Sequence, residues 1–176
     1  GGSGAGWLTL MGSLQWRRVP QDPPVAAVAR AAAGNAEQEA CFVAPGLAVG
    51  ARFPPPAVPR LASEHGISRV VDLRVEDCDD EAALRTHGIR LLHLPTTDTH
   101  ALSQERIRHG VGFVSEGLDG GERVLVHCQY GIGRSALLAL CVLVARGDAP
   151  LEALERMKRA RPVVSPSPAQ LHAFIA

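Results

Sequence analysis

The sequence predicts an α/β fold in which a mainly parallel central sheet is flanked by helices on both faces. The first indication is the alternation of short apolar segments, which have the length of strands, with longer helical segments. The second is the segment 123–127, whose apolar core lacks polar alternation, as in a strand buried on both faces. The third is the Gly-bearing loop that follows this strand and leads directly into an apolar helix.

The strands are bounded by residues that break regular structure. Pro45 and Gly46 divide the first strand region into two short strands. Gly66 precedes the next strand and an acidic turn follows it, whereas Pro95 closes the strand after that. The four expected strand regions are residues 42–49, 69–74, 89–94 and 123–127.

The helices carry recognisable start and stop signals. Ser103 is placed as the N-cap of the long helix 103–118. Gly88 ends the earlier helix 80–87. Arg161 and Pro162 stop an amphipathic helix near the end of the chain. The expected helices are a short one that ends at His65, then 80–87, 103–118, 135–146 and 151–159, and a last one that begins near Ser167.

A change in composition near Ala40 indicates the domain organisation. Residues 1–39 are rich in Gly, Ala and Pro, so we expect an N-terminal extension or linker. Its first four residues, Gly-Gly-Ser-Gly, resemble an expression linker. Residues 40–176 are expected to form one compact domain.

Composition excludes several classes of partner. The formal net charge at pH 7 is zero, so we expect no nucleic acid and no strong attraction to acidic membranes. The longest apolar run, residues 136–145, is half of the ~20 residues of a membrane span. The four cysteines lack zinc-ligand spacing, so we expect no metal, no cofactor and a reducing, cytoplasmic location. Lys158 is the only lysine, and this bias towards arginine indicates a prokaryotic source.

The loop after residues 123–127 carries the candidate chemistry. The strand delivers Cys128 to the carboxyl edge of the sheet, where open α/β folds bind ligands. The following helix points its positive N-terminal end back at the cysteine, and Gly131 and Gly133 let the loop turn its amides inward. Arg134 adds a planar fork that matches two phosphate oxygens. We therefore expect a Cys128 thiolate near neutral pH that attacks a bound phosphoryl group.

The segment 127–135, His-Cys-x5-Arg-Ser, resembles the signature of the protein tyrosine phosphatase superfamily. The length of the domain is similar to that of the compact dual-specificity phosphatases, including small prokaryotic ones. This resemblance implies metal-free phosphoryl transfer through a phosphocysteine, with a phosphatase-type P-loop between strand and helix. The amides expected around the phosphate belong to Gln129, Tyr130, Gly131, Ile132, Gly133 and Arg134.

Three further residues receive roles in this interpretation. We expect His127 to hold the loop, and Ser135 to stabilise the cysteine sulfur as a leaving group. The family places an aspartate on the loop that follows the preceding strand, and Asp98 lies there, thirty residues before Cys128. Asp98 is therefore assigned as general acid and then as base for water, against the alternative of an aspartate in a polar turn.

Other titratable residues are given structural interpretations. Asp77, Asp79 and Asp80 follow an earlier strand, and we expect a solvated surface or a helix N-cap there. Asp72 and Arg74 are expected to form a buried hydrogen-bonding pair. The remaining assignments are His93 as structural, His100 as a weaker candidate acid, and Cys78 and Cys141 as packing residues rather than disulfide partners of Cys128.

Gln170 follows an Arg-Pro turn, as in family branches where a glutamine positions the hydrolytic water; a place on a helix surface is the alternative. For the substrate, a phosphorylated protein is favoured because Gln129 and Tyr130 bring no lysine into the loop. The alternatives are a phosphoinositide or other small phosphomonoester, and a non-enzymatic phosphate-binding pseudophosphatase. Membrane association is expected only through a missing fusion partner or a lipid substrate.

Overall fold

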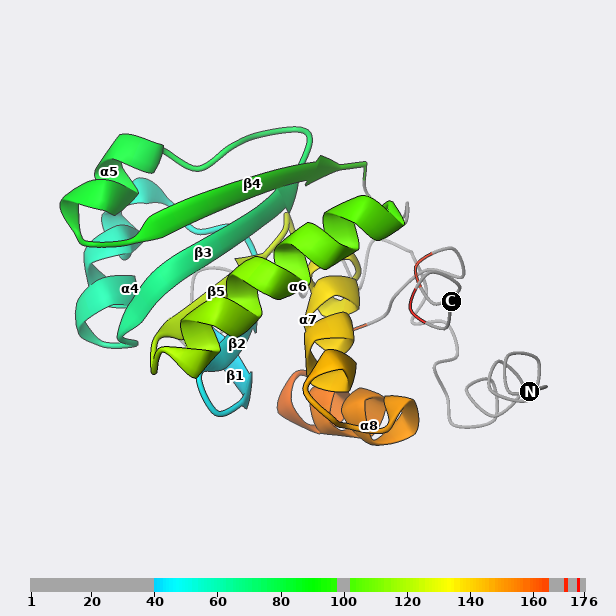
Figure 1. Cartoon of the computed structure of the whole chain (residues 1–176). Coiled ribbons are helices and arrows are strands. Elements are labelled where there is room, and N and C mark those ends of the chain that lie inside the picture. Colours follow the sequence, from blue (N-terminus) through cyan, green and yellow to red (C-terminus); the bar gives the residue numbers. More distant parts are fainter. Residues whose placement is uncertain (1–39, 98–101, 165–169, 171–173, 175–176) are drawn as a thin grey trace.

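The computed structural model describes residues 40–97, 102–164, 170 and 174. Its centre is a five-stranded sheet with the strand order β1-β2-β5-β3-β4 (Figure 1). The β1 strand pairs with β2 antiparallel, and the other neighbours are parallel. The strands are β1 (Cys41–Ala44), β2 (Leu47–Gly50), β3 (Ile67–Arg74), β4 (Arg90–Thr96) and β5 (Arg123–His127). The predicted α/β fold with a mainly parallel sheet is confirmed.

Helices cover both faces of this sheet (Figure 1). A short 3-10 turn and two short helices lie on one face: η1 (Pro55–Ala57), α4 (Val58–Ser63) and α5 (Glu81–Thr86). The other face carries α6 (Gln104–Asp119) and α7 (Arg134–Ala145), with α8 (Pro150–Ala160) packed against α7 and β1. Parallel strands need such crossover helices, which explains why the sheet is buried on both sides.

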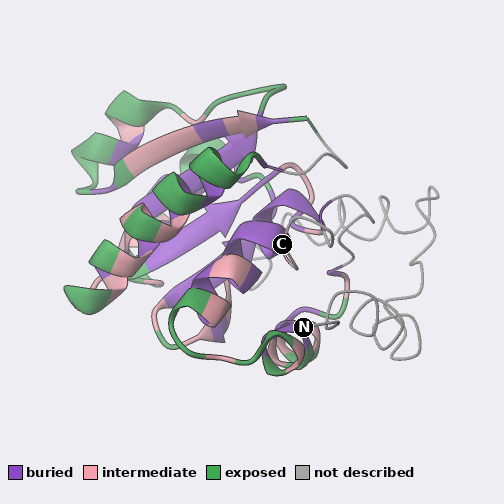
Figure 2. Cartoon of the chain, turned by 45° about the vertical axis from the view of Figure 1, so that its right-hand side comes forward, coloured by how far each residue is buried: buried purple, intermediate pink, exposed green. Residues whose placement is uncertain are grey.

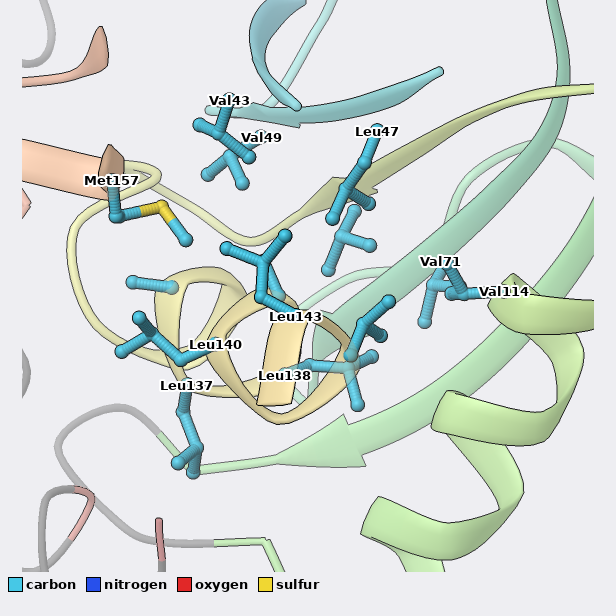
Figure 3. Close-up of a cluster of buried hydrophobic side chains, with 14 of the residues drawn as sticks. Val43, Leu47, Val49, Val71, Val114, Leu137, Leu138, Leu140, Leu143 and Met157 are labelled. Atoms are coloured by element: carbon cyan, nitrogen blue, oxygen red, sulfur yellow. The ribbon is translucent and has the colours of Figure 1, made fainter. Parts of the chain in front are cut away.

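The core therefore consists of two apolar layers, one on each side of the sheet. On the α6–α7 side, Val124 and Val126 of β5 belong to the same cluster as Leu137, Leu138 and Leu140 of α7, and all five are fully buried. Figure 3 shows these three leucines within the cluster. On the other side, the β5 residue Leu125 belongs to the layer under α4 and α5. Burial on both faces is the physical reason why β5 lacks polar alternation. In Figure 2, α7 is buried along almost its whole length, whereas the outer face of α6 is exposed.

The cap predictions agree with the structure. The Ser103 side chain accepts a hydrogen bond from the Arg106 amide at the start of α6. Gly66 lies three residues after the end of α4 and has φ +66°, a conformation that favours glycine. Some boundaries differ from the predicted ones: α4 ends at Ser63 rather than His65, and β3 begins at Ile67 rather than Arg69. The β4 strand continues through Pro95 to Thr96. Because β4 is an edge strand, a proline without an N–H group is tolerated there.

Two predicted segments lie outside the described residues: the extension 1–39 and most of the last helix near Ser167. Among the helices that the structure describes, none is both long enough and apolar enough to cross a membrane.

Candidate active site

The loop after β5 lies at the carboxyl edge of the sheet and joins it to α7. The β5 strand ends at His127, and α7 begins at Arg134 with Gly133 as its N-cap. Among the described residues no side chain caps this N-terminus, and the first amides of a helix point out of its N-terminal end, here towards the loop. A helix N-terminus of this kind attracts anions. Cys128 lies at the base of the loop and is 2% exposed.

The Cys128 sulfur has a hydroxyl beside it. The distance from Cys128 Sγ to Ser135 Oγ is 3.2 Å, and Ser135 is fully buried in the first turn of α7. A hydroxyl at this distance can donate to a thiolate and stabilise the negative charge on sulfur. The structure thus brings together the two residues that the sequence pairs.

Tight packing behind the loop explains why glycine occupies position 131. Gly131 has φ +66°, and a Cβ built on it would lie 2.7 Å from the Gly50 carbonyl and 2.7 Å from the Arg161 guanidinium. Any larger residue would therefore push the loop away from β2. The Cys128 amide also donates to the Gly50 carbonyl oxygen at 3.4 Å, so β2 supports the start of the loop.

Arg161 lies behind the loop and was not assigned a role from the sequence. Its side chain is 2% exposed, its Nε donates to the Gly131 carbonyl at 2.9 Å, and Nη2 donates to the Tyr130 carbonyl at 3.2 Å. Burial lowers the pKa of Arg161, and the neighbouring Cys41 and Cys128 oppose that shift. By holding two loop carbonyls on its own side, Arg161 leaves the adjacent amides directed to the opposite side, where an anion would bind.

The Arg134 side chain is fully buried and held by an acid that the sequence did not reveal. Its Nη1 and Nη2 donate to Glu76 Oε1 and Oε2 at 2.7 and 2.9 Å, and Nη1 also donates to the Thr96 carbonyl at 2.7 Å. The hydrogen bonds from Arg134 hold the pKa of Glu76 at about 2, well below its ordinary value of 4.5. The guanidinium is therefore fixed in place before any phosphate binds.

His127 anchors the other end of the loop through a buried polar network. Its Nε2 lies 2.5 Å from Asp79 Oδ2, and its ring packs on Phe53 at a centroid distance of 4.7 Å. Arg74 bridges Asp79 and Asp72 with hydrogen bonds of 3.0 to 3.1 Å. Burial opposes ionisation of Asp72, but the bonds from Arg74 and the nearby His127 lower its pKa overall. The predicted buried pair of Asp72 and Arg74 is confirmed.

The acidic turn after β3 agrees with the predicted solvated surface or N-cap at Asp77 and Asp80, but not at Asp79. Asp80 is the N-cap of α5, as one alternative proposed, because its side chain accepts from the Ala83 amide. The side chain of Asp77 is 68% exposed. For Asp79, however, the expectation was wrong: its side chain is only 3% exposed. It is drawn inward because β3 and β5 are adjacent parallel strands, so their carboxyl ends lie together.

The family model for the dual specificity phosphatase catalytic domain matches residues 55–176. The chain belongs to the dual specificity phosphatase family.

Two curated relatives illustrate how much of this domain is shared. Dual specificity protein phosphatase 1 of Mus musculus is 36% identical over 76 residues, which are 42% of this chain and 21% of the relative. Dual specificity protein phosphatase 2 of Homo sapiens is 41% identical over 61 residues, which are 34% of this chain and 19% of the relative. The matched region thus spans about a fifth of the length of these relatives.

Solved structures resemble the domain over most of its length. Tk-PTP in its active form gives a TM-score of 0.71 at 26% identity and covers 77% of this chain and 93% of that chain. Human DUSP28 gives 0.67 at 25% identity and covers 75% and 90%. PTPMT1 in complex with PI(5)P gives 0.71 at 24% identity and covers 76% and 90%, a likeness that shows the fold alone.

The sequence also named Gln170, Asp98 and His100, and of these the structure of the dual specificity phosphatase domain describes Gln170. Gln170 is 1% exposed, so the alternative of a helix-surface position is wrong. A Cβ on Gly133 would lie 2.6 Å from Gln170 Oε1, which places this amide against the loop. Asp98 and the weaker candidate His100 lie outside the described residues, but Thr96, two residues before Asp98, contacts Arg134.

Further titratable side chains cluster beside the site. Two sets of side chains in the described region present ligand atoms close enough for a metal ion: Asp72, Cys78 and His93, and Asp72, Asp79 and His127. In both sets Arg74 supplies the positive charge beside Asp72 that a metal ion would bring. His93 Nε2 lies 2.6 Å from the Arg74 carbonyl oxygen, in keeping with its predicted structural role.

Glu76 offers a first test of the dual specificity phosphatase site. Hydrogen bonds to a charged group are worth about 1.5 kcal/mol or more, so we expect Glu76→Gln to lower kcat/KM about tenfold. With a pKa of about 2, Glu76 is ionised at every pH from 4 to 8. Its contribution to folding stability is complete above about pH 4.5 and disappears as the pH falls towards 2. The variant should therefore lower the plateau of the pH–rate profile without moving either limb.

A pH–rate series on purified wild type and Glu76→Gln checks this expectation, with thermal melts of both proteins to compare stability. A shifted acid limb in the variant would show that Glu76 titrates during catalysis and would contradict a purely positioning role.

Proposed function

We propose that the chain is a phosphomonoester hydrolase that works through a phosphocysteine intermediate. The observation that carries this proposal is the pairing of a buried cysteine sulfur with a buried hydroxyl at 3.2 Å, beneath a loop whose closing arginine is already fixed by Glu76. Membership of the dual specificity phosphatase family supports the same chemistry.

In the first step, the Cys128 thiolate attacks the phosphorus atom and forms the S–P bond. The P–O bond to the leaving group breaks at the same time, and the Asp98 carboxylic acid gives its proton to the leaving oxygen. The loop amides and Arg134 hold the three remaining phosphoryl oxygens, where charge must be stabilised in the transition state. The Thr96 contact supports this role for Asp98, because two residues of chain span roughly 7 Å at most.

In the second step, a water molecule attacks the phosphorus atom of the phosphocysteine. The Asp98 carboxylate takes a proton from the water, the P–O bond forms and the S–P bond breaks. Ser135 donates to the departing sulfur, which leaves as a thiolate, and inorganic phosphate is released. Gln170 lies against Gly133 of the loop, and we propose that its side-chain amide orients this water.

The substrate class that we propose is a phosphorylated protein. The loop residues Gln129 and Tyr130 bring no positive charge towards a highly phosphorylated head group. The rival is a phosphoinositide, for which the likeness to PTPMT1 in complex with PI(5)P is the motivation. We also propose a reducing, cytoplasmic setting, in which the four free cysteines would persist as thiols.

Hydrolysis of p-nitrophenyl phosphate, with inhibition by vanadate, tests the chemistry. A phosphate-binding module without activity would bind phosphate but release no nitrophenol, and a sulfurtransferase would act on thiosulfate instead. A panel of phosphopeptides, PI(5)P vesicles and inositol phosphates then tests the substrate class. Higher kcat/KM on the lipid than on every peptide would overturn the protein assignment.

Asp98 can be tested by a substitution that removes only its ability to carry a proton. We expect Asp98→Asn to lower kcat on p-nitrophenyl phosphate by about 10²-fold or more, because the leaving oxygen must then depart unprotonated. The fall of kcat/KM on the alkaline side, where a general acid loses its proton, should also flatten. His100→Asn is the matched control, and it should retain most of the activity; the reverse pattern would make His100 the acid.

A further inference from the structure

A pocket opens at the carboxyl edge of the sheet, beside the loop of residues 128–134. We call this loop the phosphate loop, after its proposed role. The pocket has a volume of about 620 Å³ and lies between the segment after β2 and the turn that leads from β3 into α5. We call it the side pocket. Apolar residues of η1, α4, α5 and the preceding segment form part of its wall, and charged residues form the rest. The lining is Arg52, Phe53, Pro54, Pro55, Val58, Arg74, Asp77, Cys78, Asp79, Asp80, Ala83 and Leu84.

The side pocket is joined to the phosphate loop at two places. The Arg52 amide donates to the Gln129 carbonyl at 3.1 Å, so one wall is bonded to the first residue after the cysteine. On the other wall, Asp77 follows Glu76, which holds Arg134. Adjacent Cα atoms in a peptide are about 3.8 Å apart. A substrate residue next to the phosphorylated one is therefore within reach of the side pocket.

The charges around the side pocket favour a cation. Arg74 is engaged by Asp72 and Asp79 with hydrogen bonds of 3.0 to 3.1 Å, so its charge is compensated within the wall. Its contact with Asp77 is longer, at 3.5 Å, and the Asp77 side chain remains 68% exposed. Among the lining residues, the exposed negative charges are those of Asp77 and Asp80, and the exposed positive charge is that of Arg52. Exposed negative charge is therefore in excess. Burial raises the pKa of the Cys78 thiol, and Asp72, Asp79 and Asp77 raise it further while only Arg74 opposes them. The raised pKa of the Cys78 thiol is thus consistent with a negative electrostatic potential at this wall.

We propose that the side pocket takes a lysine or arginine side chain that neighbours the phosphorylated residue of a protein substrate. This inference rests on the proposed phosphatase function and specifies its substrate class. The aliphatic stem of such a residue covers Phe53 and Pro54, while its charged end reaches the carboxylates of Asp77 and Asp80. A second phosphate group, as on a polyphosphorylated inositol, would meet the same carboxylates and be repelled.

The test compares two phosphotyrosine peptides that differ only in having lysine or glutamate on both sides of the phosphotyrosine. The wild-type chain should give a kcat/KM that is about fivefold to tenfold higher for the lysine peptide, because exposed ion pairs are individually weak. In Asp77→Lys this ratio should fall to one or below. In Asp119→Lys, the same change at the opposite edge of the sheet, the ratio should stay at the wild-type value.

Each result has a distinct meaning. If wild type does not hydrolyse p-nitrophenyl phosphate, the proposed function fails. If it hydrolyses p-nitrophenyl phosphate but treats both peptides alike, or prefers the glutamate peptide or PI(5)P, only the side-pocket inference is overturned. Because the ratio is measured within one protein, a partial loss of folded enzyme does not affect it. Should Asp77→Lys fail to fold, Asp77→Asn replaces it, and an undiminished preference in that variant overturns the inference.

Discussion

Replacement of Cys128 by serine is expected to lower kcat on p-nitrophenyl phosphate by about 10⁴-fold or more. Serine retains the shape of the side chain, but its hydroxyl does not ionise near neutral pH. Among the described residues, the side chain that forms a hydrogen bond with residue 128 is that of Ser135, whose hydroxyl is no base. The loop amides and Arg134 remain in place, so binding of inorganic phosphate and of phosphopeptide should persist.

The measurements are steady-state kcat for turnover and calorimetric titration with a phosphotyrosine peptide for binding. Cys141→Ser is the matched control, since Cys141 is a half-buried residue of α7 and burial raises the pKa of its thiol to about 12. That variant should keep wild-type turnover. Retention of more than a few per cent of activity by Cys128→Ser would mean that another group is the nucleophile.

The strand–loop–helix geometry around residues 128–134 could be predicted because its determinants are consecutive in the sequence. A buried strand, a cysteine, two placed glycines and an arginine before an apolar helix describe the local geometry almost completely. The structure adds the reasons for the glycines: Gly131 lies against Gly50 and Arg161, and Gly133 lies against Gln170. These contacts come from β2 and from the end of the chain, so no local pattern contains them.

The residues that hold the loop were missed for the same physical reason. Glu76 meets Arg134 across 58 residues of chain, and Asp79 meets His127 across 48. The sequence did contain one indication that Glu76 and Asp79 lie near the loop. Their acidic turn follows a strand that was expected to be parallel to β5. Parallel neighbours end at the same edge, which would have placed this turn beside the loop. Arg161 gave no comparable signal, because a buried arginine and a surface one look alike in a single sequence.

Replacement of Arg134 by lysine is expected to lower kcat/KM by about 10³-fold. The guanidinium contacts both Glu76 oxygens and the Thr96 carbonyl, and it is fully buried. A lysine ammonium is a compact group that cannot reproduce the planar fork towards Glu76 and also meet two phosphate oxygens. Both phosphate affinity and the rate of the chemical step should therefore fall.

Kinetics on p-nitrophenyl phosphate and titration with phosphate measure the loss of catalysis and of phosphate binding. Thermal melts show whether the variant is still folded. Arg146→Lys, at the exposed C-terminal end of the same helix, is the matched control and should behave like wild type. A folded Arg134→Lys protein whose kcat/KM lies within tenfold of wild type would contradict the role of the planar fork.

The double variant Glu76→Gln/Arg134→Lys extends this test to the pair. If Glu76 acts only by orienting Arg134, its replacement costs little once the guanidinium is gone, and the two effects on kcat/KM will not add. Additive losses would instead mean that Glu76 contacts the substrate or the leaving group directly. Because Glu76 is held ionised by Arg134, its carboxylate would be a poor proton donor to either, so the non-additive result is the one we expect.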